Sequence, residues 1–321
     1  MNLIVLVIIF LVASVILYFS SEEIIKGLTG LSKYLGVTEF VLSFFIIAFA
    51  ASIPNLFVGV TSALRGVPEL SFGDIMGNNI VAITLGIGLS TLFAPKKEIK
   101  AENQTIKGST VFTFISAVLP LVLIYDGVLS RTDGLILIGF FAYYMYWLFS
   151  KKERFSKVYE EHEIEIIPET GQFFKDIVKV FFGFIFLLVA AQGIVYTSSE
   201  FAAQLGLPLV MVGVLILGLG SALPEVYFAI SSARKNETGI ILGNIMGAVI
   251  IPATLILGIV SLISPIQAHE FELFTISRGF LFIATTVFFL AVKSDEKVTK
   301  FEAITMLVIY VLFVITTLRF Y

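Results

Sequence analysis

The stretch AFAASIPNLFVGVTSALRG (Ala48–Gly66), followed by FGDIMGNNIVAITLGIGLSTLFAP (Phe72–Pro95), occurs in this chain a second time in altered form. Shifted by 170 residues, Ala48–Pro95 aligns without a gap on Gly218–Pro265, which contains GLGSALPEVYFAISSARKN and LGNIMGAVIIPATLILGIVSLISP. The two copies are identical at 13 of 48 aligned positions. The identical pairs include Pro54/Pro224, Ser62/Ser232, Gly73/Gly243, Gly77/Gly247, Thr84/Thr254 and Pro95/Pro265. Similarity at one fixed offset indicates an internal repeat, so two related halves are predicted.

Long apolar runs extend over the rest of the chain. Of its 321 residues, 58% are hydrophobic and 14% are charged, whereas soluble proteins carry about 25% charged residues. Runs of about 20 apolar residues have the length of a helix that crosses about 30 Å of hydrocarbon. Because the runs are continuous and not alternating, they favour helices over a β-barrel. Ten segments are predicted, at 2–19, 39–64, 71–94, 109–125, 132–150, 173–196, 207–233, 239–264, 272–292 and 300–319.

The order of these segments predicts how the two copies are oriented. The copies cover the second and third segments and the seventh and eighth segments, so an odd number of helices separates them and they cross the membrane in opposite directions. Repeats of this inverted kind place their binding site near the bilayer midplane. The predicted fold class is therefore an all-α polytopic membrane protein with ten transmembrane helices in two inverted-topology five-helix repeats. The repeats are expected at 1–150 and 173–321, joined by a cytoplasmic linker at 151–172.

The basic residues predict the orientation of the bundle. Most lysines and arginines lie in loops that follow odd-numbered segments, while the other loops carry little more than Arg65 and Arg131. Because positive loops stay in the cytoplasm, both termini are predicted to be external. Met1–Ser20 is interpreted as the first membrane helix, because it has neither a basic start nor a clear cleavage site. The expected location is the plasma membrane of a prokaryote.

Each copy contains residues that interrupt helices. Pro54 and Pro224 lie in mid-segment, where a proline removes one backbone hydrogen bond. Gly77 and Gly247 permit close approach or local unwinding. Ordinary kinks and small-residue packing are the alternative explanation. Recurrence in both copies, beside polar residues, favours helix breaks that form part of a site.

Only two acidic residues, Asp74 and Glu225, lie well inside the predicted segments. A charge buried in a membrane is costly, so a functional role is the default hypothesis for both. The alternative for Glu225 is a protonated acid that hydrogen-bonds between helices, and for Asp74 a place among the headgroups at a helix start. Gln192 is interpreted as an interhelical hydrogen-bonding residue, and Arg278 as a snorkelling side chain.

GLGSALPE (Gly218–Glu225), followed by GNIMGAVI (Gly243–Ile250), resembles the second α-repeat of the calcium/cation antiporter superfamily, which includes the sodium/calcium exchangers. The family pattern is approximately G-[ST]-S-x-P-E, then G-N-x-x-G-S-N-x-x-[DN]. The resemblance spans both repeats and implies ten helices, alternating access, and cations held where the four repeat helices converge. It also implies that Glu225 is the principal cation ligand.

The first copy departs from the family pattern. Asn55 occupies the position of the family's other glutamate, and an amide oxygen can coordinate a hard cation but adds no charge. Asp74 occupies the position of a family asparagine, which the second copy keeps as Asn244. Asp74 and Glu225 together are expected to supply the negative charge of the site. The family's serine and asparagine become Asn78 and Asn79 in the first copy and Ala248 and Val249 in the second. The later polar ligand position holds Ala82 and Pro252.

The candidate site is a set of oxygen donors around these carboxylates. Glu225 and Asn55 are expected to be direct metal ligands. The full cation-binding set is Glu225, Asn55, Asp74, Asn78, Asn79, Ser52, Ser221 and Asn244, with backbone carbonyls at Ala51 and Gly220. The helix breaks expected to expose those carbonyls are at Pro54, Pro224, Gly77 and Gly247.

The predicted function is secondary active antiport, in which calcium or a related cation is exchanged for sodium or protons. A monovalent cation/proton exchanger is one alternative, because a single carboxylate with neutral oxygens suits it. A sensor or scaffold of the same fold that does not transport is another. No cofactor is expected beyond the transported cations (calcium, sodium or protons). The expected partners are the lipid bilayer and these ions, with no nucleic acid and no identified oligomeric partner.

An enzyme is not expected. Phe72-Gly73-Asp74 contains the Gly-Asp of intramembrane aspartyl proteases, but no second aspartate lies well inside a predicted segment. The chain has no H-E-x-x-H sequence and no P-loop lysine motif. The absence of cysteine excludes thiolate metal sites and cysteine nucleophiles. A regulatory or metal-binding role of the Glu/His cluster around His162 in the linker is a further alternative to a solvated surface.

Overall fold

A computed structural model describes residues 2–34, 39–101, 104–150, 170–235, 238–268, 271–294 and 296–319. This part of the chain is almost entirely helical. Its α-helices are α1 (Leu3–Tyr34), α2 (Glu39–Leu64), α3 (Pro68–Val81), α4 (Ile87–Phe93), α5 (Gln104–Leu123), α6 (Arg131–Phe149), α7 (Thr170–Leu205), α8 (Leu209–Val212), α9 (Gly218–Arg234), α10 (Thr238–Ile251), α11 (Leu257–Ile263), α12 (Phe271–Ser294) and α13 (Lys300–Arg319). Three π-helical turns, η1 (Ala82–Gly86), η4 (Gly213–Leu217) and η5 (Pro252–Ile256), join neighbouring helices into longer rods, and a 3-10 turn, η2 (Ile124–Asp126), follows α5. The strands are β1 (Ile99–Lys100), β2 (Val128–Leu129), β3 (Ile266–Gln267) and β4 (Lys297–Val298).

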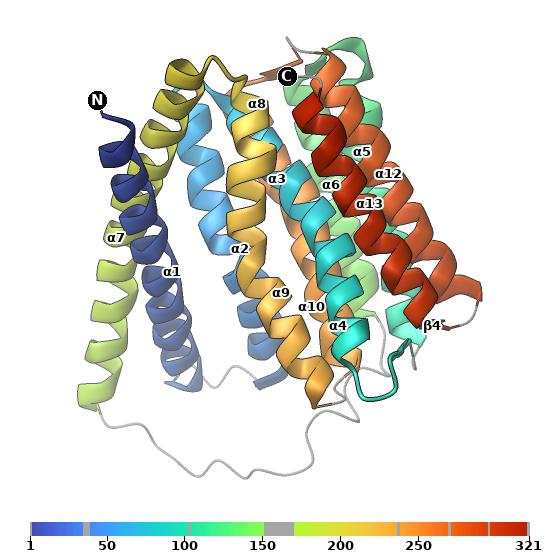
Figure 1. The fold of residues 1–321 in the computed structure, drawn as a ribbon. Coiled ribbons are helices and arrows are strands. Elements are labelled where there is room, and N and C mark those ends of the chain that lie inside the picture. The colour runs from blue at the N-terminus through green and yellow to red at the C-terminus, as the bar shows by residue number, and fades with distance from the viewer. Residues whose placement is uncertain are drawn as a thin grey trace.

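The helices are long and apolar enough for a membrane protein. Among the described residues, nine helical stretches have the length and composition to cross a membrane, and Ser52–Leu64 of α2 is a shorter apolar one. The rods run side by side in one bundle, and the start of α1 lies at the same end as the end of α13 (Figure 1). The predicted all-helical membrane fold is therefore confirmed, and the predicted segment at 39–64 coincides with α2.

Two helices extend well beyond the predicted apolar segments. The segment predicted at 2–19 continues to Tyr34, and the last turns carry ion pairs from Lys26 to Glu22 at 3.0 Å and to Glu23 at 2.9 Å. Such i,i+4 and i,i+3 pairs stabilise exposed helical turns. The hydrogen bonds to Glu23 and Glu22 raise the pKa of Lys26. The segment predicted at 173–196 becomes α7, which ends before Gly206, a residue with a φ of +65° that suits glycine.

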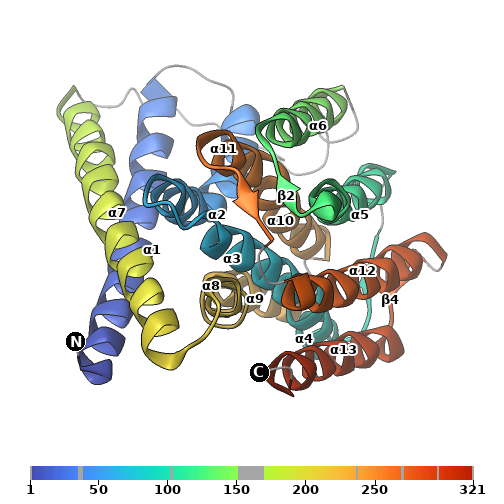
Figure 2. The ribbon, with the colours of Figure 1, turned by 90° about the horizontal axis from the view of Figure 1, so that it is seen from above.

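The bundle has an outer pair of helices beside a larger body. Helices α1 and α7 contact each other along one side (Figures 1 and 2). Viewed from above, α2, α3, α9 and α10 occupy the middle, and α5, α6, α12 and α13 lie on the far side (Figure 2). The polar residues predicted to bind cations belong to the four middle helices.

The 170-residue offset of the sequence recurs in the backbone. Each bound of the rod formed by α3, η1 and α4 differs by 170 from the corresponding bound of the rod formed by α10, η5 and α11. In both rods the π turn contains a threonine, Thr84 or Thr254, whose hydroxyl donates to the carbonyl four residues earlier at 2.5 Å. Strand β1 pairs with β4 and strand β2 with β3, so each small sheet joins a loop of one half to a loop of the other.

The helices continue through all four residues that were expected to break them. Pro54 lies inside α2, Pro224 inside α9, Gly77 inside α3 and Gly247 inside α10. Departures from α-helical geometry occur instead at the π turns η1, η4 and η5. Membrane helices tolerate prolines and glycines where neighbouring helices and local π adjustments support the backbone, which explains why the expected breaks are absent here.

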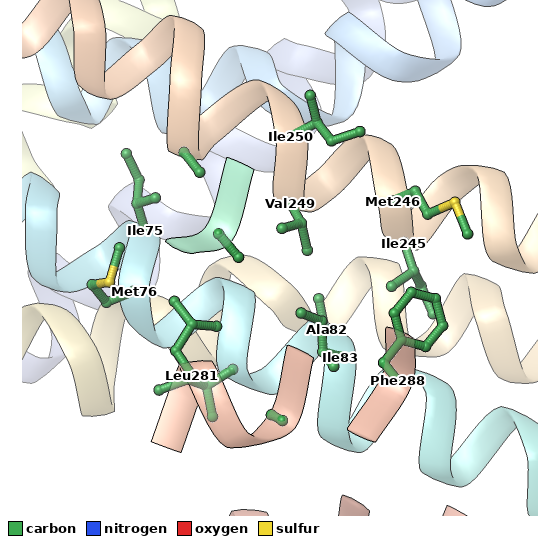
Figure 3. Packing of buried hydrophobic residues seen from close by; sticks show 14 of the residues in the cluster. Ile75, Met76, Ala82, Ile83, Ile245, Met246, Val249, Ile250, Leu281 and Phe288 are labelled. Atoms are coloured by element: carbon green, nitrogen blue, oxygen red, sulfur yellow. The ribbon is translucent and has the colours of Figure 1, made fainter. Parts of the chain in front are cut away.

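Apolar side chains fill the space between the middle helices and α12. Ile75 and Met76 of α3, Ile245 and Val249 of α10, and Phe288 of α12 are all buried in one cluster (Figure 3). Large side chains here fix the distance between α3 and α10. The side chains of Asp74 and Asn78 on α3 lie outside this cluster and contact α9 and α10.

Candidate functional site

Glycines bring α3 into backbone contact with the rod formed by α8, η4 and α9. A Cβ atom added to Gly73 would collide with the carbonyl oxygen of Val210, and one added to Gly77 with that of Val214. Conversely, a Cβ at Gly218 would lie 2.6 Å from the backbone nitrogen of Asn78. Only glycine permits such an approach. The close crossing places residues 74–78 of α3 against the start of α9.

A cluster of oxygen atoms lies at this crossing. The Ser221 hydroxyl donates a hydrogen bond to Oδ1 of Asp74 at 2.9 Å. It also lies 3.4 Å from Oδ1 of Asn78 and 3.4 Å from the carbonyl oxygen of Gly218. Asp74 is only 3% exposed, and as the seventh residue of α3 it does not lie in the first turn of that helix. The carboxyl group of Asp74 instead binds a side chain of the other half.

Glu225 brings the second carboxyl group to the same region. It follows Ser221 by one helical turn on α9 and is only 6% exposed. Within the described part of the chain, its Oε2 has no hydrogen-bond partner. Because Ser221, one turn earlier on the same helix, donates to Asp74, the carboxyl group of Glu225 belongs to the same crossing. Two buried acids, one on α3 and one on α9, therefore lie at this crossing.

Asn78 is held by a carbonyl group that the sequence analysis missed. Its Nδ2 donates to the carbonyl oxygen of Ala248 at 3.3 Å. Pro252 has no N–H and cannot donate to this carbonyl from the position four residues later, which leaves the oxygen of Ala248 available. We had treated Ala248 and Pro252 only as positions that lack a ligand side chain. The signal was present in the sequence, because a proline frees the carbonyl of the residue four positions earlier.

The same reasoning applies to the two prolines in mid-helix. Pro224 cannot donate to the carbonyl of Gly220, so that oxygen is available without a break in α9. In α2 the carbonyl freed by Pro54 is that of Ala50, because Ala51 faces the N–H of Asn55 at this spacing. Two backbone carbonyls are expected at the site, those of Gly220 and Ala51. A proline leaves the carbonyl of Gly220 without its helical donor, but not that of Ala51.

The remaining predicted residues lie on α2, α3 and α10. Ser52 and Asn55 are buried in α2, which contacts α3, α9 and α10. Asn79 is fully buried, and neither atom of its amide has a partner among the described residues. The Nδ2 atom of Asn244 on α10 also lacks a partner there. These amides offer polar atoms that remain unsatisfied within the described residues.

Two other sequence interpretations concern residues away from the cluster. Gln192 of α7 accepts a hydrogen bond from Nε of Arg65 at the end of α2 at 2.5 Å, which confirms its interhelical hydrogen bond. Arg278 places its guanidinium over the ring of Tyr125, 5.8 Å from the centroid. The Glu/His cluster around His162, and most of the linker at 151–172, lie outside the described residues.

The chemistry of the cluster suits a hard cation. Its donors are carboxylate, amide, hydroxyl and backbone carbonyl oxygens, which are the ligands that calcium and similar cations prefer. No group of three or more histidine, aspartate or glutamate residues gathers anywhere in the described part of the chain. The site therefore combines a small negative charge with several neutral oxygens.

Comparison with known proteins gives one family. The model of the sodium/calcium exchanger protein family matches residues 5–150 and 176–319. The chain is 26% identical to a putative antiporter, CaxA, from Alkalimonas amylolytica, over 79% of this chain and 80% of that protein. It is 24% identical to the sodium/calcium exchanger MaX1 from Methanosarcina acetivorans, over 96% of this chain and 97% of that protein.

Solved structures show the same fold. The H⁺/Ca²⁺ exchanger CAX superposes with a TM-score of 0.76 at 16% identity, over 98% of this chain and 87% of that protein. The sodium-calcium exchanger NCX_Mj superposes with a TM-score of 0.62 at 23% identity, over 97% and 98% of the two chains. Because the family model covers both halves and the fold agrees along nearly the whole chain, this protein belongs to the sodium/calcium exchanger protein family.

Proposed function

We propose that this chain is a secondary active cation antiporter that exchanges calcium, or a related cation, for sodium or protons by alternating access. One observation carries the proposal: the buried carboxyl groups of Asp74 and Glu225 lie with neutral oxygens at the crossing of α3 and α9, in a chain of the exchanger family. Relatives bear names that state sodium/calcium or H⁺/Ca²⁺ exchange. Glu225 is the principal cation ligand in this proposal.

The architecture we propose is ten transmembrane helices in two inverted five-helix repeats, at 1–150 and 173–321. The constant 170-residue offset between the bounds of the rods built on α3 and α10 supports it. The pairing of β1 with β4 and of β2 with β3, each between the two halves, supports it as well. The contact between Asn78 and Ala248 adds further support, because these residues are 170 apart. Residues that are equivalent in a two-fold repeat and also touch must lie beside the two-fold axis. In an inverted repeat that axis runs in the membrane plane, so the site lies near the midplane.

The orientation we propose follows from the basic loops. The sheet of β1 and β4 joins two loops that carry Lys96, Lys97, Lys100 and Lys297. Loops rich in lysine stay in the cytoplasm. Strand β4 lies at the end of the bundle opposite the start of α1 and the end of α13 (Figure 1), so both termini are external in this proposal. The protein would then act in a plasma membrane, which we assign to a prokaryote.

The alternative functions are not favoured. Asn55, which lacks a carboxylate, suits a monovalent cation/proton exchanger, but Asp74 brings a second buried carboxylate to the crossing with the helix of Glu225. A sensor or scaffold that does not transport has no specific observation in its favour. The family consists of exchangers and not of enzymes, and its members handle cations as substrates.

Transport in reconstituted liposomes tests the proposal. Calcium uptake would be measured under an outward sodium gradient and, separately, under an outward proton gradient, for the native protein and for the Glu225→Gln variant. We expect uptake under one of the gradients and its loss in the variant. Glu69→Gln, a neutralised acid in the first turn of α3, is the matched control and should transport normally. Failure of the native protein to move calcium under either gradient would contradict the proposal.

A further inference from the structure

The two repeats carry their carboxylates at different, non-equivalent positions. Directly after the proline that lies in mid-helix, the first repeat has Asn55 and the second has Glu225, which are 170 residues apart. In the following helix the order is reversed, with Asp74 in the first repeat and Asn244 in the second. Each repeat therefore has one carboxylate and one amide at these two positions. The carboxylate lies on α3 in the first repeat and on α9 in the second.

The displaced carboxylate is not isolated at its new position. Asp74 lies one helical turn before Asn78 on α3, and both side chains face Ser221 of α9. Ser221 in turn lies one turn before Glu225 on its own helix. The side chains that connect the two carboxylates are thus a hydroxyl and an amide, both of which present an oxygen atom.

The oxygen atoms of this group outnumber the hydrogen atoms available to them. The Ser221 hydroxyl has one hydrogen, yet Asp74 Oδ1, Asn78 Oδ1 and the Gly218 carbonyl oxygen lie 2.9, 3.4 and 3.4 Å from it. Of the two hydrogen atoms of the Asn78 amide, one is donated to the carbonyl oxygen of Ala248. The Oε2 of Glu225, in a side chain more than nine-tenths buried, lacks a donor within the described residues. Buried oxygens without donors attract a cation.

We propose that Asp74, Asn78, Ser221 and Glu225 form one divalent-cation site, and that Asp74 has taken over the role vacated at Asn55. This inference rests on the proposed function and specifies the site at which it operates. Two carboxylates balance the charge of a single divalent ion, while the hydroxyl and amide oxygens complete its shell without adding charge. When the ion binds, Ser221 stops donating to Asp74 and turns its oxygen lone pair toward the ion. The ion lies between α3 and α9 in this proposal, at the crossing where Ser221 contacts Asp74.

Calcium binding by the purified protein tests the assignment. Binding would be measured by titration calorimetry for the native chain, for Asp74→Asn and for the matched control Glu69→Gln on the same helix. We expect Asp74→Asn to raise the Kd for calcium by about 100-fold or more, because it removes a full charge next to a divalent ion. Glu69→Gln should bind like the native protein. Native calcium affinity in Asp74→Asn would overturn the inference.

A double variant tests the exchange of roles. Asn55→Glu combined with Asp74→Asn returns the carboxylate to α2 and keeps the total charge. We expect it to recover at least about tenfold of the calcium affinity lost in Asp74→Asn alone. Affinity no better than that of the single variant would refute the transfer of the role from position 55. Ser221→Ala should weaken binding about tenfold, while Ser116→Ala, which removes a buried hydroxyl of α5 without a partner in the described chain, should not.

A measurement on the native protein covers the case in which Asp74→Asn does not fold. An apolar carbodiimide would label buried carboxyl groups with and without calcium, and mass spectrometry would locate the label. Calcium should protect both Asp74 and Glu225. Protection of Glu225 alone would overturn the inference and leave the proposed function intact. If the native protein shows calcium transport but Asp74 is neither protected nor needed, only the site assignment fails; if no calcium is transported, the proposed function fails.

Discussion

The helix pair α2–α3 and the helix pair α9–α10 have related sequences but divide the chemistry differently. Their rods share bounds at a constant offset, and the threonine hydrogen bonds of the π turns have the same length. Their charged side chains nevertheless lie at different positions, Asp74 in one pair and Glu225 in the other. The backbone of the repeat is thus retained where packing requires it. The carboxylate of the first pair lies on α3, at the crossing with α9, whereas that of the second pair lies on α9 itself.

The glycines of the two pairs also differ in their surroundings. Gly73 of α3 lies against the backbone of Val210 and Gly213, so there is no space for a side chain. Its counterpart Gly243 on α10 is exposed, and no described atom lies within 4 Å of a Cβ placed there. The α3 glycine is needed for the crossing that forms the oxygen cluster. The α10 glycine has no such role in this structure.

Giving both repeats the same uncharged residue after the mid-helix proline should have the largest effect on calcium exchange. In Glu225→Asn, the second repeat carries at this position the residue that the first repeat has at Asn55, and Asp74 remains as the one carboxylate. We expect calcium exchange to fall by about 100-fold or more, because a unit charge at about 4 Å contributes about 4 kcal/mol at an effective dielectric constant of about 20. Uptake into liposomes measures this. Asn55→Gln, which keeps the amide, should lower uptake less than about tenfold; equal losses in the two variants would show that the repeats contribute equally.

The glycine pair should give a smaller difference, in stability. Gly73→Ala forces a methyl group into the backbone of the α8–η4 rod and should cost about 1–3 kcal/mol, the usual range for overpacking. Gly243→Ala should be neutral, or stabilising by up to about 1 kcal/mol, because alanine is the better helix former. Thermal unfolding of both variants in detergent would check the comparison. A loss of stability in Gly243→Ala equal to that in Gly73→Ala would mean that both crossings are equally close.

The smallest effect is expected at the two small sheets. Beside β1 and β4, Lys297 donates to Glu98 at 3.0 Å, and Lys107 pairs with Glu296. The hydrogen bond from Lys297 lowers the pKa of Glu98. A carboxyl group whose pKa is lowered on folding adds stability above its ordinary pKa, and this stability is lost as the pH falls through the lowered value. Lys297→Met should therefore lower the unfolding temperature slightly at pH 7.

Conditions that weaken ion pairs provide the check. The difference between Lys297→Met and the native protein should shrink at pH 3 and in high salt, since exposed pairs are screened. Gln267→Met on β3 is the matched change in the other sheet, at an exposed position, and should give no pH-dependent difference. A constant difference at all pH values would assign the effect of Lys297 to packing and not to charge.

The sequence allowed much of the site to be predicted, but not its contacts. The Pro54/Pro224 and Gly73/Gly243 matches predicted the repeat, and the rarity of intramembrane acids identified Asp74 and Glu225. The prediction of helix breaks at Pro54 and Pro224 was wrong. Neighbouring helices and π turns support a continuous backbone in a way that no local sequence signal shows. The burial of Asp74 also needed the structure, because it depends on the helix packed alongside.

By itself the sequence determined the helical membrane class, the 170-residue repeat and the two acids, because these depend on hydrophobic length, on self-similarity and on the cost of burying charge. Only the tertiary structure decided which oxygens meet. The contacts of Ser221 with Asp74 and of Asn78 with Ala248 join residues 147 and 170 positions apart. They exist because glycines let α3 approach α9, and because Pro252 leaves the carbonyl of Ala248 without its helical donor.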